Sequence, residues 1–436
     1  MSKVLVLGLS KSGKSAAKFL NRHGYDVYLT ESKSVEVDPE LEELGIKIET
    51  GGHSLNFVEG AEFAVTSPGI PPHSIIIELL RLKNIPVISE IELAYKMSKT
   101  PFIAITGTNG KTTTTALTAH IFAKKFKSKA CGNIGQPPCD LADDKLDYFV
   151  CEMSSYQIAM SPTLTPFISV WTNFTPDHID WHQGLENYFS AKAKIFKSPQ
   201  APKYSVLNAC DEKLKSFDAE GEVFYFGERK TGNCCYVKNN EFIYEHDGVI
   251  EFTMPTNCCP LVGEHNFQNV ECAIICAKLA GIDNATIIEA ISEFKAPEHR
   301  LELVAQTDKI SFYNDSKATN PEASIVAIKS FNNQNVVLIA GGRDKNTSLK
   351  EFCDEVNKHI TTVILIGEAT ERFEKNLKNC GFSDILKEKT LQSAIDKSIE
   401  LSPDVVLLSP ACASFDMFNS YEHRGEVFKD YVLSRI

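Results

Sequence analysis

The sequence lacks the features that would mark a membrane or secreted protein. No stretch of its 436 residues approaches the ~20 consecutive apolar residues that a membrane-spanning helix needs. The apolar run after Met1-Ser2-Lys3 has only the length of a strand, so no signal peptide is indicated. Solenoid repeats and low-complexity linkers are missing as well. We therefore expect a cytoplasmic protein that does not insert into a membrane.

Metal-binding cysteine patterns and an excess of positive charge are also missing. The thirteen cysteines include no C-x-x-C pair, which disfavours structural zinc. Cys272 and Cys276 are one helical turn apart and are expected to be buried as small apolar side chains. The net charge of −12 disfavours nonspecific nucleic-acid binding, so we expect no nucleic-acid partner. In a protein with this net charge, a bound phosphate group must be neutralised by Lys or Arg side chains that lie close to it.

Short apolar strand patterns alternate with helical patterns along the chain, which indicates an α/β protein. The alternation predicts three domains, residues 1–97, 98–296 and 297–436, the last beginning where Pro297 ends a helical pattern. The first and third should contain parallel sheets. Segment 233–254, rich in Gly, Asn and aromatics, predicts a β-meander inserted into the second domain. The predicted strands are 4–7, 27–30, 46–48, 63–66, 87–88, 148–152, 168–172, 206–208, 223–226, 310–313, 336–340, 363–366 and 405–408.

The segment Gly107-Thr-Asn-Gly-Lys-Thr112 joins a strand pattern, 102–105, to a pattern suited to a helix. Its glycines let backbone N–H groups face an anion, and the helix N-terminus adds roughly half a positive charge. Lys111 would reach the outer phosphates of a nucleotide, and Thr112 would coordinate magnesium. An ordinary glycine-containing turn is the alternative. A glycine pair followed by Lys-Thr at a strand–helix junction favours phosphate binding.

A second loop, Gly8-Leu-Ser-Lys-Ser-Gly-Lys-Ser15, fits the strict G-x-x-x-x-G-K-[ST] pattern better. On the pattern alone, this loop would be the site that binds a nucleoside triphosphate. A dinucleotide-binding type of fold also needs a turn after its first strand, which is the position of this loop. A P-loop switch built on it would need a magnesium-binding Asp at the end of the next strand, where only Glu31 stands. A nicotinamide-dependent oxidoreductase would need G-x-G-x-x-G, which Gly8-Leu9-Ser10 breaks.

Polar side chains follow two strand patterns of the second domain. Glu152 could complete the magnesium coordination begun by Thr112, with a solvated loop glutamate as the alternative. The His- and Asp-rich segment 173–182 suggests metal binding or general-base catalysis, with a polar capping loop as the alternative. In the following helical pattern Lys192 and Lys194 are two residues apart and face different sides. The spacing does not decide which of them faces the site.

The later part of the chain carries candidate nucleotide and anion contacts. Asn266 and Asn269 share one face of a predicted helix, where paired amides can contact a nucleobase, although Asn is also a common helix cap. Three successive strand patterns of the third domain end in segments containing Lys, Ser or Arg, which predicts a shared anion-binding face. These segments are 313–320, 341–345 and 408–425.

Taken in order, these residues resemble the Mur ligases of bacterial cell-wall synthesis, over nearly the whole chain. The resemblance implies a Rossmann-like N-terminal domain with a parallel sheet for a UDP-linked substrate. It further implies a central P-loop ATPase-like α/β domain with a β insertion, and a Rossmann-like C-terminal α/β domain for D-glutamate. The residues that carry it are Gly107–Thr113, Glu152 with Ser154-Ser155, Asp177-His178, His265-Asn266 with Asn269, His299-Arg300, Asn314–Asn320 and Ser409–Asp416.

The resemblance assigns the triphosphate to the Lys111 loop and makes Gly8–Ser15 a lookalike near the diphosphate of the substrate. Lys11 and Lys14 depart from the family's usual residues, and their role stays open. Tyr421 stands where the family commonly has Phe. The implied residues are Lys111, His178 and Lys192 for catalysis; Gly107, Thr108, Asn109, Gly110, Lys111, Thr112, Thr113, Asn266, Asn269, Arg300 and Asp315 for ATP; Ser10, Thr30, Gly69, Asn133, Lys317, Thr319, Lys345, Ser414 and Tyr421 for the substrates; and Thr112, Glu152, His178 and Lys192 for metal.

The implied reaction is ATP-driven amide-bond formation in peptidoglycan precursor synthesis. The carboxylate of UDP-N-acetylmuramoyl-L-alanine would attack the γ-phosphate to give an acyl phosphate, and the D-glutamate amine would then displace phosphate. The implied cofactors are ATP, two Mg²⁺ ions and a carbamylated lysine at Lys192, whose anionic oxygens suit magnesium. The base that deprotonates D-glutamate stays open, with His178 a candidate. We expect a monomer; a related ligase with a different amino acid, such as a folylpolyglutamate-type ligase, is the alternative.

Overall fold

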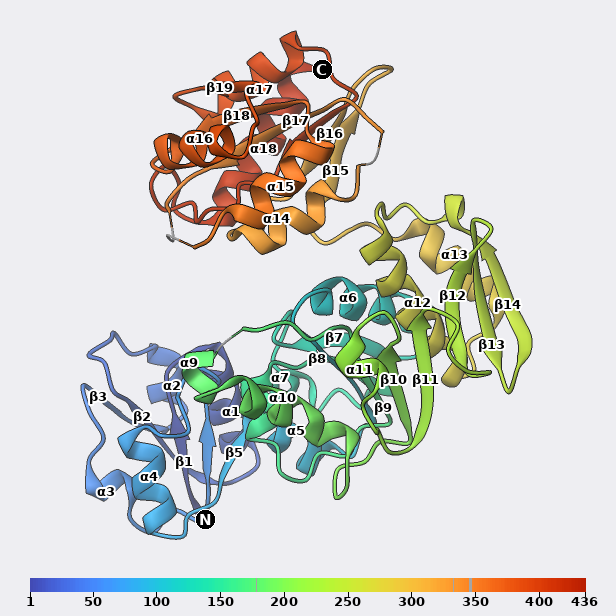
Figure 1. Ribbon diagram of the computed structural model, residues 1–436. Coiled ribbons are helices and arrows are strands. Elements are labelled where there is room, and N and C mark those ends of the chain that lie inside the picture. Colours follow the sequence, from blue (N-terminus) through green and yellow to red (C-terminus); the bar gives the residue numbers. More distant parts are fainter. Residues whose placement is uncertain (178, 332, 345–346) are drawn as a thin grey trace. The chain divides into compact units, whose positions relative to one another are not determined.

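The computed structural model describes residues 1–436 except 178, 332 and 345–346. Helices and strands alternate through the described residues, and three sheets follow one another along the chain (Figure 1). None of the described helices combines the length and the apolar character needed to cross a bilayer. The α/β class predicted from the alternating pattern is confirmed.

The first sheet comes from the N-terminal part of the chain. Its elements are β1 (Lys3–Leu7), α1 (Lys11–Arg22), β2 (Asp26–Glu31), α2 (Pro39–Glu43), β3 (Lys47–Thr50), α3 (Leu55–Val58), β4 (Ala64–Thr66), α4 (Ile75–Leu82), β5 (Val87–Ser89) and α5 (Glu90–Ser98). The strand order is β3-β2-β1-β4-β5 with parallel pairings, as predicted. Because β1 and β4 are neighbours, the loops that follow them meet at the carboxyl edge of the sheet.

The second sheet contains the strand that leads into the predicted phosphate loop. Its elements are β6 (Phe102–Thr106), α6 (Lys111–Ala123), β7 (Ser128–Gly132), α7 (Pro138–Leu141), β8 (Tyr148–Glu152), α8 (Ser155–Ala159), β9 (Ile168–Trp171), α9 (Ile179–His182), α10 (Leu185–Ala193), η1 (Lys194–Phe196), β10 (Tyr204–Asn208), α11 (Glu212–Lys215), β11 (Glu222–Gly227), β12 (Cys234–Lys238), β13 (Glu241–His246), β14 (Val249–Pro255), η2 (Thr256–Cys258), α12 (Glu264–Leu279) and α13 (Asn284–Glu293). The order is β14-β13-β12-β11-β10-β9-β6-β8-β7. The antiparallel pairs β12–β13 and β13–β14 confirm the predicted meander.

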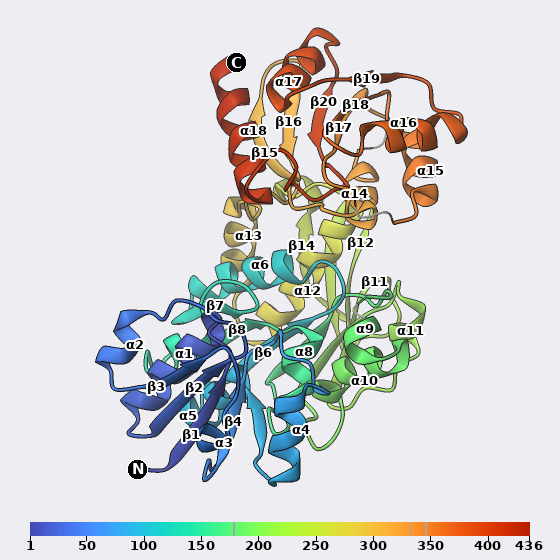
Figure 2. The same cartoon turned by 90° about the vertical axis from the view of Figure 1, so that its left-hand side faces the viewer.

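The third sheet is flanked by helices on both faces. Its elements are β15 (Glu302–Gln306), β16 (Ser311–Asn314), α14 (Pro321–Ile328), β17 (Val336–Gly341), α15 (Lys350–His359), β18 (Thr362–Ile366), α16 (Thr370–Asn379), β19 (Ile385–Lys387), α17 (Leu391–Glu400), β20 (Val405–Leu408) and α18 (Tyr421–Arg435). The order is β15-β16-β20-β17-β18-β19. One core cluster packs α14, α15 and α16 against the sheet, and another packs α17 and α18 (Figure 2). The predicted parallel sheet is confirmed for β16-β20-β17-β18-β19, and the sequence pattern did not predict β15, which pairs antiparallel with β16 at one edge.

The contacts divide the chain into two compact units, which are 1–259 with 268–293, and 260–267 with 294–436. The first two sheets belong to the same unit, and α5 joins them through buried polar groups. Ser89 Oγ lies 2.7 Å from Ser161 Oγ, and Glu92 Oε2 accepts a hydrogen bond from Leu164 N at 3.0 Å. The domain boundaries at 97 and 296 stay predictions.

Glu90 is a buried carboxyl at this same junction. It is 4% exposed, and its Oε1 accepts a hydrogen bond from Cys139 N at 2.6 Å. Burial raises the pKa of Glu90 from 4.5 to about 7. Since the folded-state pKa is the higher one, the stability that this group contributes is complete below pH 4.5 and is lost as the pH rises through 7.

The substitution Glu90→Gln keeps an oxygen that can accept from Cys139 N and removes the titration. We expect it to raise the free energy of unfolding at pH 8 by about 2–3 kcal/mol more than at pH 5. Urea titrations at the two pH values measure the difference. Glu43→Gln on the exposed face of α2 is the matched control and should show no such pH dependence. A constant effect of Glu90→Gln at both pH values would contradict the burial of an ionisable carboxyl.

Candidate active site

The loop between β6 and α6 has the backbone geometry of an anion cradle. Gly107 and Gly110 have φ angles of 151° and 79°, which favour glycine. A Cβ at Gly107 would lie 1.9 Å from Thr172 Oγ1, and a Cβ at Gly110 would lie 2.6 Å from Asn269 Oδ1. β6 lies between β8 and β9, so the loop lies at the carboxyl end of an interior strand of the sheet. Both glycines are therefore required by the local packing.

Lys111 begins α6 and folds over this loop. Its Nζ donates hydrogen bonds to Gly107 O at 3.0 Å and to Thr108 O at 2.7 Å. Thr112 and Thr113 follow in the first helical turn and are buried. The predicted lysine, hydroxyl and backbone amides thus come together at one helix N-terminus, which is the arrangement that binds phosphate.

The segment after β9 supports the phosphate loop. Asn109 N donates to Asn173 Oδ1 at 2.8 Å, and Thr108 Oγ1 donates to Thr175 O at 3.0 Å. From α12, Asn269 Oδ1 accepts a hydrogen bond from Thr114 Oγ1 at 3.0 Å. Asn269, predicted as an ATP contact, therefore packs directly against the loop and the first turn of α6.

Glu152 ends β8, next to the phosphate loop. It is 1% exposed, and its Oε1 accepts a hydrogen bond from Asn133 Nδ2 at 2.8 Å. Its Oε2 is buried and has no hydrogen-bond partner among the described residues. Gly132 allows this close approach, because a Cβ there would lie 2.3 Å from Glu152 O. Burying a carboxylate oxygen without a hydrogen-bond donor or a cation beside it costs free energy. Glu152 Oε2 is therefore suited to the predicted role of a magnesium ligand.

Lys192, the predicted carbamylation site, is buried against the same loop. It is 1% exposed, and its Nζ donates to Gly107 O at 2.8 Å and to Thr106 Oγ1 at 3.2 Å. Burial lowers the pKa of Lys192 well below its ordinary value, and the Lys111 ammonium lowers it further. The site therefore favours the neutral amine, which is the form of lysine that can react with carbon dioxide.

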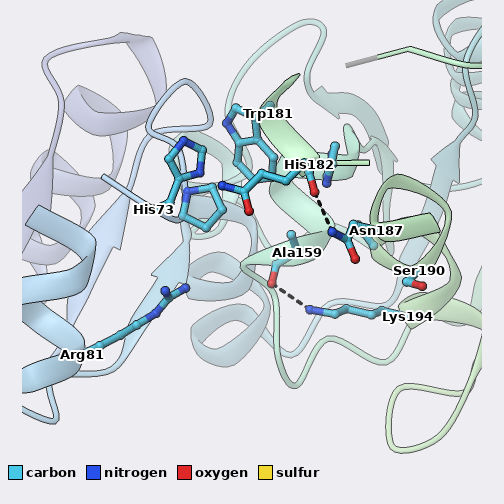
Figure 3. Close-up of a pocket in the computed structure, with 11 residues that line it drawn as sticks. His73, Arg81, Ala159, Trp181, His182, Asn187, Ser190 and Lys194 are labelled. Carbon is cyan, nitrogen blue, oxygen red and sulfur yellow. Dashed lines mark hydrogen bonds between the residues drawn. The ribbon is translucent and has the colours of Figure 1, made fainter. Parts of the chain in front are cut away.

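Lys194 lies beyond the end of α10 and lines a different cavity, of about 360 Å³. Figure 3 shows Arg81 of α4 and Lys194 on opposite sides of this cavity, with Asn187 of α10 between Lys194 and His182. Lys194 Nζ donates to Ala159 O at 3.1 Å. Of the two lysines that the spacing could not separate, Lys192 is the one at the phosphate loop.

Some predicted ligands cannot be placed. His178, predicted as a catalytic residue and metal ligand, and Lys345, predicted as a substrate contact, lie outside the described residues. Within the described part of the chain, no group of three or more His, Cys, Asp or Glu side chains could hold a metal by itself. The remaining predicted ligands are the Thr112 hydroxyl, the Glu152 carboxylate and a modified Lys192. Two of these three are not His, Cys, Asp or Glu, so they could not form a group of that kind.

The lookalike loop at the start of α1 directs its Lys and Ser side chains into other contacts. Lys14 Nζ donates to Asp38 Oδ2 at 3.1 Å, and Ser15 Oγ donates to Asp140 Oδ1 at 2.6 Å. In a triphosphate site these two positions would face phosphate and magnesium. The local geometry therefore favours the loop at Lys111 for the triphosphate.

A carboxylate also lies against the amides of the lookalike loop. Glu31 Oε2 accepts a hydrogen bond from Leu9 N at 3.0 Å, and Glu31 Oε1 accepts one from Lys33 N at 3.1 Å. Burial raises the pKa of Glu31, but these hydrogen bonds outweigh it and leave the pKa lowered. Glu31 therefore accepts a hydrogen bond from the backbone of the lookalike loop, a contact that its position in the sequence does not indicate.

The predicted substrate residues of the first sheet lie at its carboxyl edge. Ser10 Oγ donates to Ser67 Oγ at 2.9 Å, so the loops after β1 and β4 are bonded to each other, and Gly69 follows in the second of them. Thr30 is fully buried, and its Oγ1 donates to Glu49 Oε1 at 2.8 Å. Ser10 and Gly69 thus share one edge, whereas Thr30 is bonded to the neighbouring strand β3.

Arg424 organises the predicted anion-binding face of the third sheet. It is 1% exposed, and it donates to Ser316 O at 2.8 Å, to Ser316 Oγ at 2.9 Å and to Cys412 O at 3.2 Å. The guanidinium therefore joins the segments that follow the adjacent strands β16 and β20. The sequence analysis included Arg424 in a motif without assigning it a role.

The predicted D-glutamate residues that the structure describes lie in the segments after β16 and β20 and at the start of α18. Ser316 Oγ donates to Tyr421 O at 2.8 Å, and Lys317 Nζ lies 5.7 Å from the centre of the Tyr421 ring. Thr319 N donates to Lys317 O at 2.9 Å, and Ser414 is buried in the segment after β20. The structure therefore brings Lys317, Thr319 and Tyr421 to one edge of the sheet, as predicted from the strand ends.

The remaining predicted ATP contacts, Asn266, Arg300 and Asp315, lie in the second unit. Asn266 Nδ2 donates to Val262 O at 2.7 Å, and Arg300 Nε is buried without a partner among the described residues. Asp315 accepts from Ser409 Oγ at 2.7 Å, and burial raises its pKa to about 7. A buried guanidinium nitrogen in need of an acceptor is consistent with a polar ligand at Arg300.

Comparison with known proteins assigns the whole chain to one family. Residues 2–89 match the N-terminal domain of MurD-like Mur ligases, residues 105–277 match the Mur ligase middle domain, and residues 299–412 match the Mur ligase glutamate ligase domain. The chain therefore belongs to the Mur ligase family. The fold and the phosphate loop expected from that resemblance agree with this result.

Two relatives that align over nearly the whole chain carry the name of one particular Mur ligase. A UDP-N-acetylmuramoylalanine–D-glutamate ligase of Microcystis aeruginosa is 39% identical over 99% of this chain and 100% of its own length. The enzyme of the same name from Clostridioides difficile is 38% identical over 99% and 98%. Among solved structures, the UDP-N-acetylmuramate–alanine ligase MurC of Thermotoga maritima aligns over 100% of both chains with a TM-score of 0.62 and 21% identity. MurF of Acinetobacter baumannii aligns over 98% and 93% with a TM-score of 0.59 and 15% identity, so these two structures support the fold alone.

Proposed function

We propose that this chain is an ATP-dependent ligase that joins D-glutamate to UDP-N-acetylmuramoyl-L-alanine through an acyl phosphate. One observation carries the proposal: the relatives named for this activity match essentially the full chain at 38–39% identity. The names of these relatives state the substrates that we propose, and the phosphate loop at Lys111 is the proposed binding site for the nucleotide. We also propose that it acts as a monomer in the cytoplasm, in peptidoglycan precursor synthesis.

The proposed chemistry needs charge neutralisation more than covalent catalysis. The backbone amides of Gly107–Thr113 bind the phosphates, and Lys111 moves from its carbonyl acceptors to the transferred phosphoryl group. The edge with Ser10 and Gly69 binds the UDP-linked acid. The edge with Lys317, Thr319, Ser414 and Tyr421, together with Lys345, binds the carboxylates of D-glutamate.

We propose that two magnesium ions bind at the carboxyl edge of the second sheet. Thr112 and Glu152 would hold the first, and the unpartnered Glu152 Oε2 supports this role. Lys192, carbamylated, and His178 would hold the second. When bound, magnesium neutralises charge on the phosphates. The buried Lys192 supports carbamylation, because its environment favours the neutral amine that the modification requires.

The substrate assignment is tested by offering the purified enzyme a panel of amino acids. Each is supplied with ATP, Mg²⁺ and UDP-N-acetylmuramoyl-L-alanine, and the release of phosphate is measured. We expect phosphate release with D-glutamate and little with L-glutamate, L-alanine or L-lysine. Release that depends on a different amino acid, or on a folate acceptor, would replace the proposed substrates within the same family.

A further inference from the structure

The first turn of α1 is bonded to a segment of the second sheet. Lys11 Nζ donates to Gly135 O at 2.6 Å, and Ser15 Oγ donates to Asp140 Oδ1 at 2.6 Å. Ser15 is 3% exposed, whereas its acceptor Asp140 is an exposed residue, so the bond is partly buried. Both acceptors lie in segment 133–140, which comprises the loop after β7 and the first residues of α7. The lookalike loop therefore contacts a part of the chain more than a hundred residues away.

The same segment holds the candidate magnesium ligand. Asn133 N donates to Glu152 O at 2.9 Å, and Asn133 Nδ2 donates to Glu152 Oε1 at 2.8 Å. These two bonds fix both the backbone and the carboxylate of Glu152, and they direct Oε2 away from Asn133. Lys11 is thus linked to the Glu152 carboxylate through Gly135 and Asn133.

The two ends of segment 133–140 are held differently. At its far end, Glu90 accepts from Cys139 N at 2.6 Å and Ser15 donates to Asp140, and both of these side chains are buried. Near Asn133, the bond to Gly135 comes from Lys11, whose side chain is exposed. Loss of Lys11 should therefore loosen the end that carries Asn133 and leave the buried end in place.

We propose that Lys11 is a positioning residue, which holds the 133–136 part of the segment so that Asn133 orients Glu152 beside the first sheet. This inference rests on the proposed function, because Glu152 acts there as a magnesium ligand and the first sheet binds the UDP-linked substrate. Lys11 does not touch the phosphates in this account. Its contribution is to keep Asn133 and Glu152 in the geometry that binds metal and substrate.

The test compares Lys11→Met with Lys18→Met, a matched change on the same helix whose ammonium binds Glu40 and which lies outside the Gly8–Ser15 loop. For Lys11→Met we expect a roughly three- to tenfold rise in the Mg²⁺ concentration for half-maximal activity and in the KM for the UDP-linked substrate. The kcat at saturating Mg²⁺ and substrate should change by less than about twofold. Lys11→Arg, which keeps a donor, should restore both constants, and Lys18→Met should leave them unchanged. Equal constants for Lys11→Met and the wild type would overturn the proposal.

Hydrogen exchange separates this inference from the proposed function. In Lys11→Met without substrates, the amides of 132–136 should exchange faster, while those of 139–141 keep their protection. If the wild type shows no turnover that depends on D-glutamate, the proposed function fails, but the exchange experiment still tests the contact. Unchanged exchange at 132–136 in Lys11→Met would reject the role of Lys11 even in an active ligase.

Discussion

Replacing Lys111 with alanine is expected to lower kcat by at least about 10²–10³-fold. The Lys111 ammonium lies over the glycine loop, hydrogen-bonded to Gly107 O and Thr108 O, and is placed to neutralise charge on the transferred phosphoryl group. Lys192 also bonds to this loop, but its burial lowers its pKa and so favours its neutral form. Initial rates of phosphate release with saturating ATP and both substrates measure the loss.

Lys14→Ala is the matched control for Lys111→Ala, because Lys14 holds the equivalent position in the lookalike loop. Its Nζ binds Asp38, so we expect kcat to change by less than about threefold. Thermal unfolding of both variants should confirm that each is folded. Comparable losses of kcat at the two lysines would mean that the triphosphate is assigned to the wrong loop.

Replacing Lys192 with alanine is expected to lower kcat by about 10²-fold or more and to permit partial recovery with formate or acetate. The substitution removes the carbamate that we propose as an oxygen ligand for magnesium, and a small carboxylate can occupy the vacated space. The buried Nζ lies 2.8 Å from Gly107 O, so an anion restored there is beside the phosphate loop. Rates measured across a series of carboxylate concentrations show the recovery.

Lys194→Ala is the control for Lys192→Ala, since Lys194 lies beyond the end of α10 and binds Ala159 O. It should change kcat by less than about twofold, and carboxylates should have no effect on it. Intact-protein mass measurement in bicarbonate, under conditions that preserve carbamates, should find the modification on the wild type and not on Lys192→Ala. An active wild type without the modification would remove Lys192 from the proposed metal site.

Much of the fold was predictable because buried parallel strands are short, continuous apolar runs. The patterns at 4–7, 336–340 and 405–408 correspond to β1, β17 and β20, which lie in the interiors of their sheets. β15 was missed because its residues are half-buried or exposed, so its sequence has no continuous apolar run. An antiparallel edge strand of this kind is recognised by its pairing, which a single sequence does not reveal.

The site was predictable where a local motif determines the geometry. Glycines at 107 and 110 and the lysine at 111 specify a strand–loop–helix anion cradle in a few consecutive residues. Contacts over long sequence separations were not predictable. The bonds from Arg424 to Ser316, and from Lys11 to Gly135, join residues more than a hundred positions apart, so neither role follows from local spacing.

Spacing also could not distinguish Lys192 from Lys194. The helical period places them on different sides of α10, but the side that faces the phosphate loop depends on how the helix packs against the sheet. Similarly, the pattern of Gly8–Ser15 satisfies every requirement of a phosphate loop. It is the neighbouring Asp38, Asp140 and Glu31 that give its lysine, serine and backbone amide other partners.

The central claim is that the triphosphate binds to the loop between β6 and α6. A crystal structure of the protein with Mg²⁺ and a non-hydrolysable ATP analogue tests it most directly. The account predicts β- and γ-phosphate oxygens within hydrogen-bonding distance of the amides of Gly107–Thr113 and of Lys111 Nζ. Phosphates enclosed by Gly8–Ser15, with Lys14 turned away from Asp38 to meet them, would contradict it.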